Sequence, residues 1–72
     1  MIDKLMLPES VENEFTTIAG NIGRTHRMLG RIVNKFMENI PHGNRMPYYE
    51  LFSALYWRVT GENVSARTVR AW

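Results

Sequence analysis

The feature that most constrains the fold is the segment TGENVSARTVRAW at residues 60–72. Gly61 suits the left-handed backbone that ends a helix. Ser65 suits the start of the next helix, because its hydroxyl can accept a free backbone N–H two or three residues on. Val64 and Val69 then occupy the two positions that form a hydrophobic staple at a helix N-terminus. The segment therefore predicts a turn followed by a short helix that begins at Ser65 and carries on to the last residue of the chain.

Apolar residues at helical spacing predict three further helices, over residues 9–19, 24–39 and 47–60. Glycine and proline punctuate the gaps between them, in GNIG at 20–23 and in PHGNRMP at 41–47. The helix over 47–60 is apolar around most of its circumference, which favours a central position packed by its neighbours.

The length of 72 residues allows one domain with a modest core. With no cysteine, the chain has neither disulfides nor a thiolate metal site. We predict an all-α small helical domain with a helix-turn-helix-like arrangement over residues 9–72, preceded by a flexible apolar leader over residues 1–8. The apolar runs are too short for a membrane span, and the leader is too short for a signal peptide.

The end of the chain resembles the recognition segment of helix-turn-helix transcription regulators, in which a glycine turn precedes a V-S-x-x-T-V-R pattern. The matching residues here are Gly61, Val64, Ser65, Thr68, Val69 and Arg70, with residues 47–60 as the preceding helix. The turn is longer than the usual one. The resemblance implies that the last helix enters the major groove of DNA, where arginine contacts guanine and threonine contacts thymine. The nucleic-acid-binding residues would be Ser65, Arg67, Thr68 and Arg70. The alternative is a capped helix whose polar side is only solvated.

Basic residues form a stripe opposite the apolar face of the helix over 24–39, at Arg24, Arg27, Arg31 and Lys35. This stripe can dock phosphates without reading sequence, can meet an acidic protein surface, or can be a solvated face. Charge is uneven along the chain, with four acidic and one basic residue in 1–20 and three acidic and eight basic in 21–72. An acidic start and a basic body fit a nucleic-acid or acidic-protein partner.

The leader is apolar at Ile2, Leu5, Met6 and Leu7. We interpret it as a docking peptide that orders on a partner; the alternative is a frayed terminus packed loosely on the domain. The aromatic residues of 47–60 could stack on bases, but their helical spacing favours a core. Catalysis is not indicated, because there is no cysteine, serine elbow, phosphate loop or convergent carboxylate pair.

The small size, apolar leader and helix-turn-helix body also resemble the very small regulators that bacteriophages make against host RNA polymerase. That resemblance implies docking on the large polymerase subunits, displacement of the sigma factor, inhibition of initiation and suppression of termination. The leader and the stripe of 24–35 would carry the contacts. We therefore predict a monomeric, non-enzymatic regulator without cofactors in the bacterial host cytoplasm.

The alternative is a sequence-specific DNA-binding repressor or activator that uses the helix over 65–72. In that case Arg45 and Arg58 would add phosphate contacts, and duplex DNA or nascent RNA would be the partner. The polymerase reading is preferred because no dimerisation segment is evident, the last helix is short and the leader is otherwise unexplained.

Overall fold

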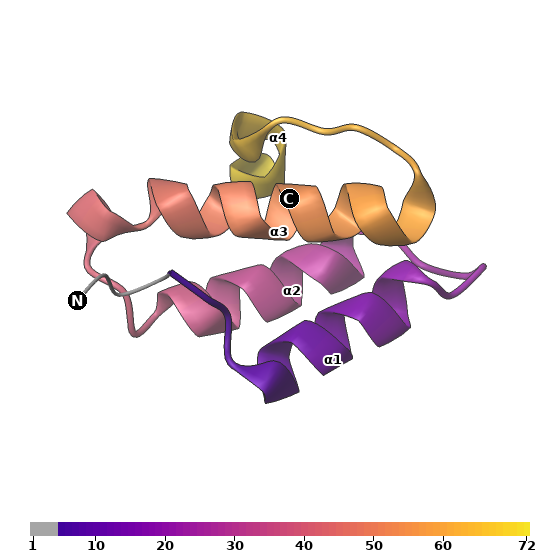
Figure 1. Cartoon of the computed structure of the whole chain (residues 1–72), viewed down its shortest axis with the longest axis horizontal. Coiled ribbons are helices and arrows are strands. Elements are labelled where there is room, and N and C mark those ends of the chain that lie inside the picture. The colour runs from indigo at the N-terminus through magenta and orange to yellow at the C-terminus, as the bar shows by residue number, and fades with distance from the viewer. Residues whose placement is uncertain (1–4) are drawn as a thin grey trace.

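In the part of the chain that the structure describes, residues 5–72 of a computed structural model, four α-helices surround one core (Figure 1). They are α1 (Glu9–Ala19), α2 (His26–Met37), α3 (Met46–Thr60) and α4 (Ala66–Ala71), with a short 3-10 helix, η1 (His42–Asn44), before α3. The all-helical class predicted from the sequence is confirmed. Ile2 lies outside the described residues.

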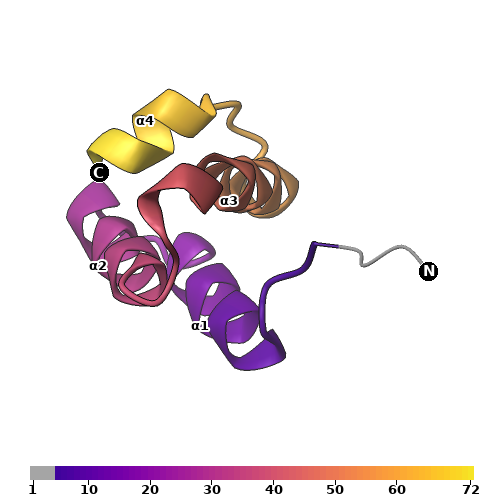
Figure 2. The same cartoon turned by 90° about the vertical axis from the view of Figure 1, so that its left-hand side faces the viewer.

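α1 and α4 each bridge α2 and α3, from opposite sides (Figure 2). Between α2 and α3 the gap is filled by aromatic rings. Phe36 meets Tyr48 and Phe52 edge-on, with ring centroids 5.2 and 5.9 Å apart, and Phe15 of α1 adds a contact to Phe52 at 5.1 Å. The core is therefore built by all four helices around α3, which explains why α3 is apolar on most sides.

Local capping sets the helix boundaries. The Thr25 hydroxyl accepts a hydrogen bond from the backbone N–H of Met28 at 3.2 Å, so α2 begins at His26 and Arg24 belongs to the preceding loop. The predicted helix over 24–39 is thus two residues too long at each end. α1 has the predicted bounds, whereas α3 begins one residue early, at Met46.

The turn between α3 and α4 has the predicted chemistry. Gly61 adopts φ 75° and donates its N–H to the Trp57 carbonyl at 2.7 Å, which ends α3. Ser65 caps α4 by accepting from the N–H of Thr68 at 3.1 Å. Between them the chain doubles back along α3, where the Ser53 hydroxyl donates to the Val64 carbonyl. α4 therefore lies across the middle of α3 rather than at its end (Figure 1).

One leader residue belongs to the core. The side chain of Leu7 is only 8% exposed and packs with the buried residues of the helices. Leu5 and Met6, directly before it, are 41% and 67% exposed. The chain thus enters the hydrophobic core two residues before α1 begins. The flexibility of the leader over residues 1–8 stays a prediction, and residues 1–4 lie outside the described part of the chain.

Candidate nucleic-acid interface

Charge is segregated by helix. α1 carries three glutamates and no lysine or arginine, whereas α2 carries three basic residues and α4 two, with no acidic residue in either. α1 and α4 lie on opposite sides of the molecule (Figure 2). The molecule therefore has an acidic side at α1 and a basic side at α4.

On the basic side, one hollow borders the contact between α4 and α2. It has a volume of about 530 Å³, and the arginines that line it are Arg27 and Arg31. The far wall is formed by Trp72, whose ring stacks on His26 with centroids 5.0 Å apart. Two guanidinium groups thus flank α4 from the α2 side.

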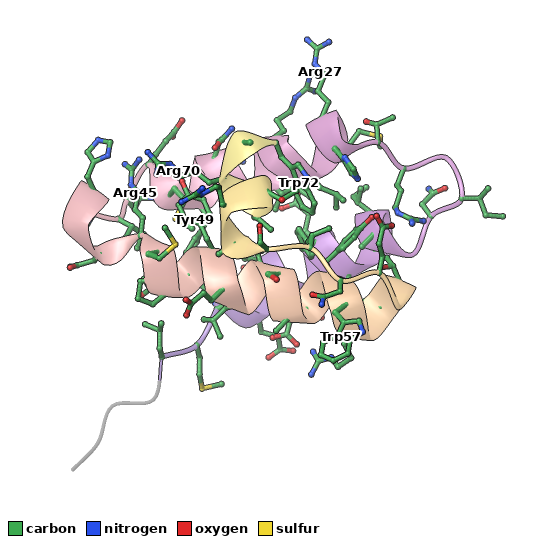
Figure 3. The ribbon with its side chains drawn as sticks, turned by 90° about the horizontal axis from the view of Figure 1, so that it is seen from above. Arg27, Arg45, Tyr49, Trp57, Arg70 and Trp72 are labelled. Carbon is green, nitrogen blue, oxygen red and sulfur yellow. The ribbon has the colours of Figure 1, made fainter. Side chains whose placement is uncertain are left out.

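A second hollow, of about 260 Å³, flanks α4 from the side of η1 and α3. It is lined by His42, Arg45, Met46, Tyr49 and Arg70. Figure 3 shows Arg45, Tyr49 and Arg70 gathered at the start of α3, and Arg27 on the other side of α4. The C-terminal half of α4 is therefore flanked by basic side chains on both sides.

The four-residue stripe predicted on the second helix does not act as one surface. Arg24 contacts the C-terminal end of α3 and the turn after it. Its Nε donates to the Tyr56 hydroxyl at 3.4 Å, and its Nη2 lies 3.9 Å from Glu62 Oε1. Lys35 lines a hollow between α1 and α2 that it shares with Glu14 and with Arg31, which also borders the hollow beside α4. Only Arg27 and Arg31 lie beside α4.

The four groove-facing residues predicted from the helix-turn-helix resemblance fall into two pairs, one bonded within the protein and one exposed. The hydroxyls of Ser65 and Thr68 are 3.0 Å apart and bond each other, and Ser65 is also engaged in the cap. Arg67 and Arg70 are exposed, and neither forms an ion pair with a carboxylate of residues 5–72. The two arginines are therefore the side chains of α4 that are available to a ligand.

Of the two further predicted phosphate contacts, only Arg45 lies on the basic side. Its Nε donates to the Ile40 carbonyl at 2.7 Å, which fixes the guanidinium plane. Arg58 lies on the opposite side, where its Nη2 is 3.7 Å from Glu12 Oε1 of α1. Pairing with α1 removes Arg58 from this face.

The leader residues that the structure describes border a hollow of about 330 Å³ formed with α3. Its apolar lining comes from Leu5, Met6, Leu7, Leu51, Ala54 and Leu55. Because Leu7 is buried in the core, Leu5 and Met6 are the large apolar side chains of the described leader that are exposed to a partner.

His42 and Tyr49 line the hollow between η1, α3 and α4, and the sequence did not predict either residue at this site. Tyr49 was placed with the aromatic core, and its ring is indeed buried, at 6% exposure. No pattern in the sequence indicates that it also lines the hollow beside Arg70, because the two residues lie on helices brought together only by the turn after Gly61. Trp57, by contrast, is 58% exposed and lies outside the core.

The described residues contain no cluster of three histidine or acidic side chains placed to hold a metal ion. Their helices are all too short or too polar to cross a bilayer. Comparison of the chain with models of protein families, with curated proteins and with solved structures found no match.

Proposed function

We propose that this protein is a transcription regulator that binds duplex DNA through the face around α4. We call this the basic face and define it by Arg27, Arg31, Arg45, Arg67 and Arg70. The observation that carries the proposal is that basic side chains flank α4 on both sides, while the acidic helix α1 lies across the molecule.

A projecting helix with basic flanks matches the geometry of a DNA groove. The major groove is about 12 Å wide and admits an α-helix, with a phosphate backbone along each wall. With α4 in the groove, Arg67 on its exposed side would meet base edges. Arg27 and Arg31 would contact one backbone, and Arg45 and Arg70 the other.

The salt dependence of binding tests the proposal quantitatively. Four phosphate contacts give a slope of log affinity against log salt of about −3.6. Raising salt from about 50 to about 200 mM should then lower the affinity for a random 20-base-pair duplex about 150-fold. Fluorescence anisotropy of the labelled duplex measures this slope.

Two variants that remove the same charge from different sides of the molecule distinguish binding by the basic face from binding by net charge. Arg70→Gln should flatten the slope by about 1 and weaken binding, whereas Arg58→Gln removes the same charge from the α1 side and should leave binding unchanged. Equal weakening by the two variants would mean that the duplex responds to net charge alone, and the proposal would be wrong.

The second candidate is docking on bacterial RNA polymerase, with displacement of the sigma factor. It is favoured by the exposed Leu5 and Met6 beside the apolar hollow, since exposed apolar side chains at a rim are typical of protein contacts. Its test is a pull-down of purified polymerase with the double variant Leu5→Ser, Met6→Ser, at two salt concentrations. Deletion of residues 1–8 is a poor test because it also removes Leu7 from the core.

A further inference from the structure

The hollow between η1, α3 and α4 has the composition of an anion site. Three of its lining side chains bear nitrogen donors, Arg45, Arg70 and His42, and none is acidic. Its volume of about 260 Å³ exceeds the roughly 30 Å³ that one water occupies in the liquid. An anion of several heavy atoms can therefore enter together with solvent.

Tyr49 brings a hydroxyl donor to the lining of the same hollow. Its ring is more than nine-tenths buried, and within residues 5–72 its hydroxyl has no hydrogen-bond partner. The hydroxyl is nevertheless accessible to solvent, because the buried side-chain polar atom without a partner in residues 5–72 is Trp72 Nε1. The Tyr49 hydroxyl is therefore free to donate to a ligand in the hollow that Tyr49 lines.

The arginines are held in complementary ways. The hydrogen bond from Arg45 Nε to the Ile40 carbonyl fixes that side chain while leaving its two terminal nitrogens unpaired among the described residues. Arg70 extends from α4 on the other wall of the hollow (Figure 3). A fixed guanidinium loses less freedom when it binds an oxyanion, and arginine pairs with phosphate oxygens through two parallel N–H groups.

We propose that this hollow, the phosphate pocket (His42, Arg45, Tyr49 and Arg70), binds one backbone phosphate of a duplex whose groove holds α4. The Tyr49 hydroxyl and the guanidinium groups of Arg45 and Arg70 donate to its two non-bridging oxygens. α3 begins at the same place without a side-chain cap, and the positive end of its dipole favours the same charge. That the phosphate comes from a DNA backbone rests on the proposed function. The ability of the pocket to bind a phosphate does not depend on it.

A pair of tyrosine variants tests the pocket with little risk to folding. Tyr49→Phe removes the hydroxyl and keeps the ring, and Tyr48→Phe is the matched control, because Tyr48 packs on Phe36 and does not line the pocket. Loss of one hydrogen bond to a charged group should weaken binding of a 20-base-pair duplex about tenfold in Tyr49→Phe. Affinity should not change in Tyr48→Phe. Thermal melts of both variants verify that they fold.

Titration with inorganic phosphate, followed by NMR of the arginine Nε–H signals, examines the pocket without DNA. Shifts confined to Arg45 and Arg70, and reduced in Tyr49→Phe, support the pocket even if no duplex binds; in that case the proposed DNA binding fails alone. Equal shifts at Arg58 mean nonspecific ion binding and overturn the pocket. Tight duplex binding with identical affinity in the two tyrosine variants also overturns it, and leaves the proposed function standing.

Discussion

Replacement of Gly30 by alanine tests how closely α2 and α4 approach each other. A methyl group at Gly30 would lie 2.7 Å from the carbonyl carbon of Trp72 and 2.9 Å from both its Cβ and its carbonyl oxygen. Ordinary contacts of a Cβ begin at 3.4 Å, so the end of α4 has to retreat by about 0.7 Å. The retreat also pulls the Trp72 ring from its stack on His26 and from its edge-on contact with Tyr56.

Alanine at position 30 has two opposing effects on the free energy of unfolding, a steric cost and a gain in helix propensity. The sign of the measured change shows which of the two is larger. Alanine in a helix interior is about 1 kcal/mol better than glycine. Overpacking of a close contact costs about 1 to 3 kcal/mol. With a steric cost near 2 kcal/mol, Gly30→Ala should lower the free energy of unfolding by about 1 kcal/mol, which corresponds to a melting temperature about 4 to 8 °C lower for a domain of this size.

Urea and thermal denaturation followed by circular dichroism measure the effect. Gly43→Ala is the control, because an added methyl there meets nothing within 4 Å. In a variant shortened by Trp72 the clash is absent, so Gly30→Ala should become stabilising, and the two backgrounds form a double-mutant cycle. If Gly30→Ala raises the stability of the full chain as much as that of the shortened one, the close approach of α2 and α4 is refuted.

Four further substitutions test the leader and the turn. Leu7→Ala should lower the free energy of unfolding by about 2 to 3 kcal/mol, because Leu7 is a core residue. Met6→Ala should change it by less than about 0.5 kcal/mol. Equal effects of the two variants in urea melts would contradict the assignment of Leu7, and not Met6, to the core. Ser65→Ala should cost about 1 kcal/mol by loss of the α4 cap, seen as faster amide exchange at Thr68. Gly61→Ala should cost about 1 kcal/mol, because φ there is 75°; an unchanged melting temperature would argue against the left-handed turn.

Local sequence signals predicted the helices well. Ser65, Gly61 and the GNIG segment act through hydrogen bonds and backbone preferences within a few residues. Such effects depend little on the rest of the fold, which is why the bounds of α1 and the cap of α4 agree with the structure. The start of α2 was missed because the Thr25 cap competes with a basic and apolar pattern that continues on both sides of it.

The candidate site was less accessible to sequence reasoning, since it depends on contacts between distant residues. Arg24 was grouped with Arg27 and Arg31 by spacing, but it is bound by Tyr56, which lies 32 positions later. Tyr49 and Arg70 meet only because the turn folds α4 back over α3. Periodicity assigns a residue to a face of its own helix, and it does not say which other helix covers that face.

The separation of charge between α1 and α4 gives the protein a permanent electric dipole. In the field of any strongly charged surface, such a body experiences a torque as well as a force. It therefore turns before it touches, so that a larger share of collisions begins in one orientation. Reversing the sign of α1 while keeping every residue of the basic face would raise the net charge and yet reduce this alignment, so association would become less selective in orientation as attraction increased.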